Sequence, residues 1–591
     1  MALNSKTLYV VSKLSYKKKY KNYIYAYEYL SDKNSEIIKS INKENIKYLD
    51  KKYDSILKQL TNILNKEQHE NFPFKFYQKS LGLGFRRFLH ICYDSYLRHN
   101  SNFNGTYNFG LLSKKLFFTP STFEEYRDFF QNTELGSEQL FSIYIETFLD
   151  VEKKKFEITP INKEQDQSLK KRKFSEIFQR FKNLTLEKIY RRFLSFIYSK
   201  KRPSVGIIGS YFSIRHLNNL MLKSNGKIQP LNIKFNHHYK EVNHTKRNDL
   251  FDQIEIKDDF DKFFKNCLIY SMPKLFIEDF SAVIKACIDK LNKMSDTEYL
   301  ISESWISSTE LSTFLAIAKD KYGIKHIYNE HNYFEHPYLG NHNYLISEMV
   351  DIFYNIGWED KKNKDNIVSG ASLFPFQIDD YSYKDKGKIL YISASPSAKI
   401  EEFNSAYGEN GENGLLYFNF INLFFNNLEN VVYDHINFRD YPSKDNWLEF
   451  SKSNYVNLSK IQYFDDFSIS AKKAMLNSKL IITDYLATSF IEALVMNIPS
   501  IFFWNQKTYI LDEVYSDFYK DLIDCGICQT NPIEAANFVN DLINNNSIKS
   551  WWYSKKTQSL RASFLKQNIG NPKNALSFYL KLIVNKSSNE N

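Results

Sequence analysis

The stretch IITDYLATSFIEALVMNIPSIFFW, residues 481–504, decides the fold class of this chain. It begins with the β-branched run Ile481–Thr483, and a polar turn follows at Asp484–Ala487. An apolar run of helical character then ends before Pro499, and a second apolar run occupies Ser500–Phe503. Strand, turn, helix and strand in this order form a βαβ unit, which belongs to a parallel sheet covered by helices.

The start of the helix in this unit is a candidate anion site. Ser489 and Glu492 have the S-x-x-E spacing of a capping box, which predicts that the helix begins just after the strand. The first free N–H groups of such a helix lie at the carboxyl end of a strand, where open α/β sheets bind ligands. The hydroxyls of Thr488 and Ser489 either hold a phosphate there or only cap the helix.

Composition narrows the class of protein. Of 591 residues, 43% are hydrophobic and 16% aromatic, so sizeable cores are expected and disorder is not. The net charge of +11 is a mild excess that suits an anionic nucleotide or an acidic membrane surface. It is too small to indicate nucleic-acid binding, and no nucleic-acid-binding signature is found.

The cellular location is also constrained by the sequence. Five cysteines are too few for a disulfide framework. The first residues lack a signal-peptide core, and no segment reaches the roughly 18–20 apolar residues of a membrane span. We therefore expect a cytoplasmic protein, with peripheral attachment to the inner membrane left open.

Two successive α/β patterns indicate two lobes. The first lobe is expected over residues 1–385, with a helical insertion at about 40–200. The second is expected over residues 386–591, opening with the strand-like run KILYIS at 388–393. It closes with a helix, and whether that helix crosses back to the first lobe is left open. Val431–His435, VVYDH, is read as a further strand of this lobe. Two Rossmann-like lobes facing a cleft are the GT-B arrangement, so the predicted fold class is α/β and GT-B-like.

The C-terminal third carries a family resemblance. The residues that carry it are Thr488, Glu492, Asn497, Pro499, Phe503, Trp504, Phe518, Gly526, Ala535, Val539, Trp551, Trp552, Arg561 and Phe564. With these residues the chain resembles the transferases encoded in bacterial O-antigen and surface-polysaccharide gene clusters, and a weaker match continues upstream from Pro273 to Trp358 and near Tyr23. Where that family usually reads Gln-His-Gly, this chain has Glu330-His331-Asn332.

The resemblance implies a GT-B glycosyltransferase that takes a sugar from a nucleotide donor. Such an enzyme stabilises the leaving phosphate with hydrogen-bond donors and cations, and a base accepts the proton of the acceptor hydroxyl. We expect no metal and no cofactor, since no Asp-x-Asp motif stands at a suitable strand end. The donor-side candidates are Ser393, Ser395, His435, Arg439, Asp484, Thr488, Ser489 and Glu492. The catalytic candidates are His331, Glu330, Asp351 and Glu335.

The leading hypothesis is a glycosyltransferase of surface-polysaccharide synthesis (O-antigen, lipopolysaccharide or capsule) acting on a glycan or lipid-linked glycan. Paired Thr488 and Ser489 resemble the turn of transferases that use CMP-activated ulosonic acids, which motivates that donor. Glu492 either binds a ribose hydroxyl or only completes the capping box. The alternatives are a polyol-phosphate transferase, a sugar-nucleotide epimerase, or a non-catalytic scaffold of a glycan assembly complex.

Overall fold

The fold is described by a computed structural model. It describes residues 8–10, 23–25, 42–100, 108–148, 155–158, 186–210, 212–303, 308–330, 336–371, 381–394, 413–439, 462–463, 469–486, 488–506 and 509–584. The chain divides into two compact units. Unit 1 comprises Met1–Ile38, Lys52–His326 and Tyr579–Asn591, and unit 2 comprises Lys39–Lys51 and Ile327–Phe578.

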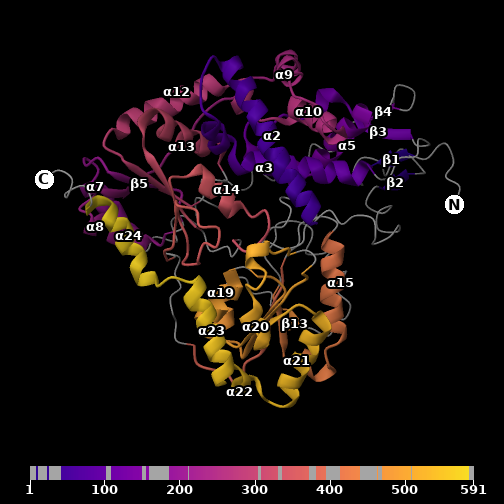
Figure 1. The fold of residues 1–591 in the computed structure, drawn as a ribbon, viewed down its shortest axis with the longest axis vertical. Helices are drawn as coiled ribbons and strands as arrows, with labels where there is room; N and C mark the ends of the chain where they lie inside the picture. Colours follow the sequence, from indigo (N-terminus) through magenta and orange to yellow (C-terminus); the bar gives the residue numbers. More distant parts are fainter. Residues whose placement is uncertain are drawn as a thin grey trace. The chain divides into compact units, whose positions relative to one another are not determined.

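Unit 1 is rich in helices (Figure 1). Local capping signals explain several of their ends; for example, Ser308 accepts a hydrogen bond from the Leu311 amide at the start of α13, and Gly323 ends that helix in the left-handed conformation. The helices that lie wholly or mainly in this unit are α2 (Lys43–Gln68), α3 (Phe74–Asn100), α4 (Phe123–Asn132), α5 (Glu134–Phe148), α7 (Leu186–Ile197), α8 (Ile214–Lys223), α9 (His244–Phe251), α10 (Asp259–Ser271), α11 (Lys274–Ile277), α12 (Phe280–Leu291) and α13 (Thr309–Tyr322).

The paired strands of the first two sheets run parallel. A small sheet has the order β2-β1-β3-β4 and the second sheet the order β10-β9-β8-β7-β5-β6. The division between the units falls inside β8, after His326. The strands are β1 (Leu8–Val10), β2 (Tyr23–Tyr25), β3 (Asn108–Leu112), β4 (Lys155–Ile158), β5 (Val205–Ile208), β6 (Ile228–Pro230), β7 (Tyr299–Ser302), β8 (Lys325–Asn329), β9 (Ile352–Tyr354) and β10 (Ile367–Val368).

The third sheet belongs wholly to unit 2 and has the order β13-β12-β11-β14-β15-β16. Its strands also pair in parallel. Its central strands are buried at every residue, which explains their nearly continuous apolar sequences. The strands are β11 (Ile389–Ile392), β12 (Ile436–Arg439), β13 (Gln462–Tyr463), β14 (Leu480–Thr483), β15 (Ser500–Phe503) and β16 (Cys528–Gln529).

Helices pack around this third sheet (Figure 1). The core beneath them is aromatic: Phe424 from α15 stacks on Phe503 from β15, with ring centroids 4.6 Å apart. The helices of unit 2 are α14 (His342–Met349), α15 (Asn413–Asn426), α16 (Asn430–Tyr433), α18 (Ala471–Leu476), α19 (Thr488–Val495), α20 (Lys520–Asp524), α21 (Pro532–Asn544), α22 (Ile548–Trp552) and α23 (Lys555–Asn568). The last helix, α24 (Pro572–Val584), passes from unit 2 into unit 1 at Tyr579.

The structure confirms the predicted α/β class and the βαβ unit of residues 481–504, which is β14, α19 and β15. One predicted strand is wrong. Val431–His435 does not form a strand: α16 ends at Tyr433 and β12 begins at Ile436. Val432 and Tyr433 are buried in the core from a helix, so their tertiary environment overrides the β propensity of this run. Among the described helices, none combines the length and apolar character needed to cross a membrane.

A close backbone crossing in unit 2 yields a stability prediction. Gly357 has a φ of 122°, and a Cβ added there would lie 1.8 Å from the Gly570 backbone nitrogen. That nitrogen donates to the Ile356 carbonyl at 2.8 Å, so neither chain segment moves freely. We expect Gly357→Ala to lower the free energy of unfolding by about 3 kcal/mol, measured by urea denaturation.

Gly323→Ala is the matched control for that variant. Gly323 also has positive φ, 67°, but an added Cβ there meets no atom within 4 Å. Gly323→Ala is therefore expected to lower the free energy of unfolding only by the strain of a left-handed alanine, about 1 kcal/mol. Equal losses in the two variants would show that the backbone crossing at Gly570 contributes nothing.

Candidate functional site

Polar residues gather at the carboxyl edge of the sheet in unit 2. In the register of that sheet, Ile392 of β11 pairs with Arg439 of β12 on one side and with Thr483 of β14 on the other. The three strands therefore end at one level, and the residues that follow them share one edge of the sheet. Ser393 follows β11 and Asp484 follows β14, so three of the predicted donor-side residues are brought together here.

Asp484 is the hydrogen-bonded centre of this edge. Its Oδ2 accepts from the Tyr391 hydroxyl at 2.8 Å and from the Tyr417 hydroxyl at 2.7 Å. Its Oδ1 accepts from the Ala394 amide at 2.7 Å. The carboxylate is 2% exposed, so it holds the first residues after β11 against the turn after β14 rather than facing a ligand.

Ser393 also acts within the protein. Its side chain is buried, and its Oγ lies 2.9 Å from the Tyr417 hydroxyl, the same group that donates to Asp484. Ser393 and Asp484 are therefore both hydrogen-bonded to the Tyr417 hydroxyl, and their binding of a nucleotide stays a prediction. Ser395, the other predicted residue of this loop, lies outside the described residues.

Arg439 supplies the cation of this edge. It is the last residue of β12, follows the core residue Phe438, and is 6% exposed. Its Nη2 donates to the Ile469 carbonyl at 2.9 Å, which fixes the guanidinium at the end of the strand. A guanidinium presents five N–H donors in a rigid fork, a geometry suited to phosphate oxygens.

The first turn of α19 adds backbone and hydroxyl donors. The helix begins at Thr488, so Ser489 lies inside it, and the predicted capping box of Ser489 and Glu492 is wrong. The Ser489 Oγ instead lies 3.2 Å from the Tyr485 hydroxyl. The helix begins five residues after β14, so its N-terminus lies at this edge, and a helix N-terminus attracts anions.

Glu492 does not form the capping box that its spacing from Ser489 predicts. Its carboxylate is only partly exposed and makes no hydrogen bond with any described residue. Burial raises the pKa of Glu492, and the nearby Lys472 opposes that shift. Partial burial of an ionised carboxylate is costly, and perturbed carboxylates of this kind are candidates for a functional role.

The raised pKa leads to a prediction on stability. A carboxyl whose pKa is higher in the folded state contributes stability below its unfolded pKa and loses it as pH rises through the folded pKa. At pH 7 the ionised Glu492 therefore costs stability, and Glu492→Gln removes that cost. We expect the variant to melt roughly 1–3 °C higher than wild type at pH 7 and equally at about pH 4, measured by calorimetry. A lower melting temperature at pH 7 would show that the ionised carboxylate has stabilising partners.

His435 is not part of this edge, which corrects its predicted place at the end of a strand. It precedes β12, and its carbonyl accepts from the Ile389 amide at the start of β11. Its neighbours are Lys479 and Lys388, which together with burial lower the pKa of His435. The imidazole thus lies at the amino edge of the sheet, about 13 Å of strand away from Arg439.

Glu330, a predicted base, is a buried structural carboxylate. Its Oε1 accepts from Asn343 Nδ2 at 2.8 Å. Its Oε2 accepts from Trp358 Nε1 at 2.7 Å and from the Ile356 amide at 3.0 Å. The side chain is 2% exposed, so the carboxylate joins the end of β8 to the turn after β9. Trp358 is fully buried and stacks on His336, with ring centroids 4.4 Å apart.

Asp351 lies at the opposite edge from Glu330. Asn329, the last residue of β8, pairs with Tyr354, whereas Asp351 precedes β9. About four residues of strand, roughly 13 Å, therefore separate the two levels, and one acceptor site does not contain both carboxylates. The other two predicted catalytic residues, His331 and Glu335, lie outside the described residues.

Sequence reasoning missed three residues that build these clusters: Tyr391, Tyr417 and Asn343. A signal existed for Tyr391, because a tyrosine in an otherwise apolar buried strand needs a partner for its hydroxyl. None existed for Tyr417 or Asn343, whose partners lie 67 and 13 residues away. Within the described ranges, no three His, Cys, Asp or Glu side chains are grouped to hold a metal ion, and metal independence stays a prediction.

Several solved structures align with this chain at low identity. The wall teichoic acid polymerase TagF aligns over 73% of this chain and 100% of its own, with 12% identity and a TM-score of 0.33. A UDP-GlcNAc 2-epimerase from Neisseria meningitidis bound to UDP-GlcNAc covers 66% of this chain and 99% of its own, with 14% identity and a TM-score of 0.34. Acinetobacter baumannii MurG covers 64% and 99%, with 13% identity and a TM-score of 0.32. No curated protein matches the sequence.

A family model supplies the assignment that these low-identity alignments do not. It is the model of the LIC12162 family transferases, and it matches residues 21–583. The match includes both sheets with six strands and all the site candidates discussed above. The chain therefore belongs to the LIC12162 family of transferases.

Proposed function

We propose that this transferase moves a sugar from a nucleotide-activated donor, and that the donor phosphate binds at the carboxyl edge of the sheet in unit 2. The observation that carries the proposal is the shared level of Arg439 and Thr483, which puts a buried cation and the turn before α19 at one edge. A guanidinium and the positive end of a helix dipole are matched to phosphate oxygens, whose charge grows as the sugar leaves.

Each residue of this edge has a separate role in the proposal. Arg439, with the hydroxyls of Thr488 and Ser489, binds the phosphate of the leaving nucleotide. Glu492, which has no cap to complete, accepts a hydrogen bond from a ribose hydroxyl. Asp484 and Ser393 keep the loop after β11 in place through Tyr417. No metal takes part in this scheme.

The acceptor side of the proposal rests on His331. It follows β8 directly after Glu330, whose carboxylate is anchored by three hydrogen bonds. We propose that the His331 imidazole accepts the proton of the acceptor hydroxyl as the glycosidic bond forms. Glu335 is the second candidate for this proton.

The donor we propose is a CMP-linked ulosonic acid, because a monophosphate leaving group needs only one cluster of donors beside the paired hydroxyls of Thr488 and Ser489. The product would be part of a bacterial surface polysaccharide, such as O-antigen, lipopolysaccharide or capsule. The acceptor is then a glycan or a lipid-linked glycan, and the reaction takes place in the cytoplasm or at the inner membrane.

A nucleotide panel tests the proposal on the wild-type protein. Thermal unfolding is recorded with CMP, UDP, GDP and AMP at 1 mM each. We expect CMP to raise the melting temperature the most, because a bound ligand stabilises in proportion to RT ln(1 + [L]/Kd). A larger rise with UDP or GDP would overturn the ulosonic donor and keep the glycosyltransferase. No rise with any nucleotide would overturn both and favour a non-catalytic scaffold.

A further inference from the structure

Helix α7 exposes an apolar face that the described residues of unit 1 leave uncovered. Five large side chains are 43–80% exposed, and Phe196 is the most exposed of them. At 100° per residue they fall within an arc of about 120° on the helix surface. Tyr190 and Phe193 also stack on each other, with centroids 6.5 Å apart. The five are Ile189, Tyr190, Phe193, Phe196 and Ile197.

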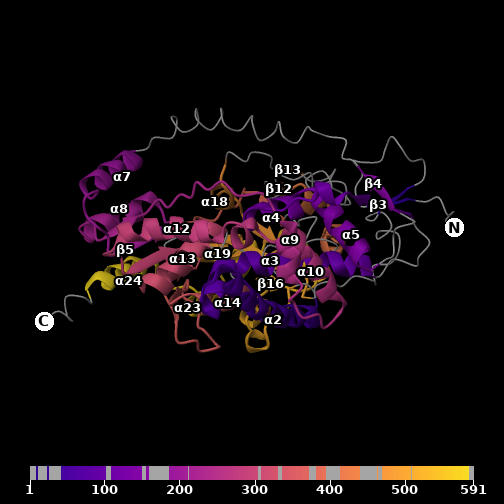
Figure 2. The same cartoon turned by 90° about the horizontal axis from the view of Figure 1, so that it is seen from above.

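The other side of α7 is the side that the fold uses. Leu194 is buried, and the Glu187 carbonyl accepts from Asn218 Nδ2 of α8 at 3.3 Å. In Figure 2, α7 lies outside α8, which in turn lies outside β5. The helix is therefore anchored through one face, and its aromatic face is presented outward by a packed scaffold.

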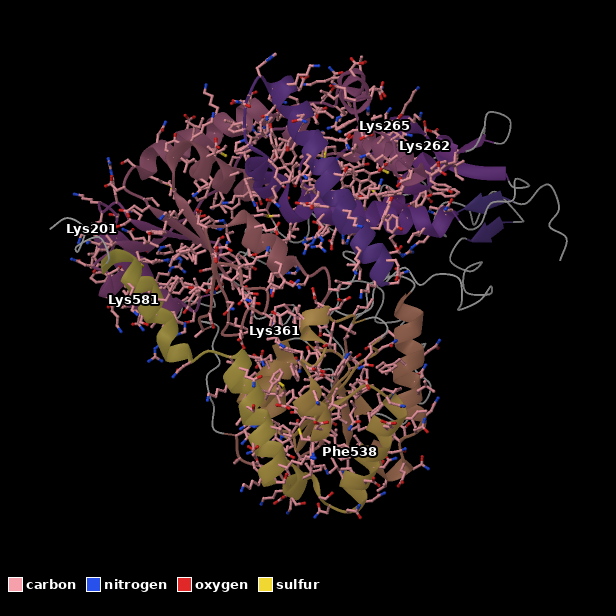
Figure 3. The ribbon with its side chains drawn as sticks, in the orientation of Figure 1. Lys201, Lys262, Lys265, Lys361, Phe538 and Lys581 are labelled. Atoms are coloured by element: carbon pink, nitrogen blue, oxygen red, sulfur yellow. The ribbon has the colours of Figure 1, made fainter. Side chains whose placement is uncertain are left out.

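Positive charge surrounds this aromatic face. Residues 186–202 contain six basic residues and one acidic residue. Arg192 lies on the flank of the apolar arc, and Lys200, Lys201 and Arg202 follow the end of the helix. Lys201 donates to Asn225 Oδ1 at 2.9 Å and Arg202 donates to Ser295 Oγ at 2.8 Å, yet both side chains stay exposed. Figure 3 shows Lys201 at the periphery of unit 1.

We propose that α7 docks unit 1 on an anionic lipid bilayer. A short helix with an aromatic face and a basic flank lies in the plane of the interface, with its apolar side chains among the acyl chains. Lysine and arginine beside it then meet the negative surface potential of the lipid headgroups. Aromatic residues and basic residues are two separate signals, and stable attachment needs two. The inference concerns a surface of unit 1 and does not depend on the donor site.

Vesicle flotation tests this docking on the full chain. Vesicles of phosphatidylcholine with 30% phosphatidylglycerol are compared with vesicles of phosphatidylcholine alone. We expect the wild-type protein to float with the anionic vesicles and to remain at the bottom with the neutral ones. Phe193→Gln/Phe196→Gln should lower the partition coefficient by at least about tenfold, because two aromatic anchors are removed. Arg192→Glu/Lys200→Glu should lower it by about tenfold or more, because each basic residue near the surface contributes about fivefold.

Two controls separate a specific effect of α7 from a general loss of apolar surface and from misfolding. Leu116→Gln/Ile256→Gln removes two apolar side chains of unit 1 that are 45% and 44% exposed, and it should float like wild type. Circular dichroism and melting temperature verify that each variant folds. Equal flotation of the wild type and the Phe193/Phe196 variant would overturn the proposal. A wild-type protein that stays at the bottom with both kinds of vesicle would also overturn the proposal. In that case, dimerisation of the wild type that is lost in the Phe193/Phe196 variant would identify a second copy as the partner of this face. Protection of α7 by residues 159–185 that is lost in the same variant would identify that segment instead.

Discussion

Asp484→Ala is expected to lower the free energy of unfolding by about 3–5 kcal/mol and to abolish nucleotide binding. The substitution removes the acceptor that the Tyr391 hydroxyl and the Ala394 amide share in a buried place. The Tyr417 hydroxyl also loses this acceptor, but it keeps the Ala394 carbonyl at 3.2 Å as an alternative. A buried donor that loses its partner costs about 1–3 kcal/mol. Urea denaturation followed by tryptophan fluorescence measures the loss, and calorimetric titration with the nucleotide measures binding.

Tyr417→Phe is the matched control, because it removes one of the three donors and leaves the carboxylate with two. We expect it to cost about 1 kcal/mol and to weaken binding only slightly. A loss of less than about 1 kcal/mol for Asp484→Ala would contradict the role of this carboxylate as the centre of the edge. A stable Asp484→Ala variant that fails to bind nucleotide would instead show that Asp484 touches the ligand.

Glu330 gives the second large effect, and the choice of substitution separates structure from catalysis. Glu330→Ala leaves Trp358 Nε1, the Ile356 amide and Asn343 Nδ2 unsatisfied, and we expect a loss of about 3–5 kcal/mol. Glu330→Gln keeps one oxygen for Trp358 and Ile356 and loses only the bond to Asn343. We therefore expect it to lose about 1–2 kcal/mol and to keep most of its transferase rate.

The rate of Glu330→Gln decides between the two roles proposed for this residue. A folded Glu330→Gln protein with a rate reduced by about 100-fold or more would identify Glu330 as the base, since an amide does not accept the proton. Asn343→Leu is the matched control: it removes the same hydrogen bond from the other side and leaves the carboxylate intact.

The parallel sheets were predictable because their strands are buried on both faces. Such strands read as continuous apolar runs bounded by polar turns, as at Ile389–Ile392, Leu480–Thr483 and Ser500–Phe503. The helix start at Pro532 was equally readable, since Asn531 accepts from the Ile533 and Glu534 amides as its capping signal indicates. Apolar runs and capping residues therefore predicted those helices and strands whose bounds are set by residues close in the sequence.

Tertiary packing decided the elements that the sequence misplaced. Val432 is fully buried from a helical turn, so a run of β-branched residues did not become a strand. Because β12 begins at Ile436 and not at Val431, His435 precedes the strand. Arg439 is therefore the cation at the carboxyl end of β12. The capping box failed for a similar reason, because a spacing of three residues does not tell where the first turn begins.

Long-range polar contacts were beyond the reach of the sequence. Nothing near Asp484 in the chain indicates Tyr417, 67 residues upstream, and nothing near Glu330 indicates the Trp358 indole. Both carboxylates looked like candidates for chemistry because carboxylates at strand ends often are. Their burial and their hydrogen bonds with described residues show instead how these carboxylates connect the ends of strands to neighbouring segments.

Nucleotide titration of a matched pair of variants tests the donor site most directly. The wild-type protein, Thr488→Val/Ser489→Ala and His435→Ala are titrated with CMP by calorimetry at low salt. We predict that the wild type binds, that the double variant binds at least about tenfold more weakly, and that His435→Ala, at the opposite edge of the sheet, binds like wild type. Unchanged affinity in the double variant, or an equal loss in His435→Ala, would contradict a phosphate site at the start of α19.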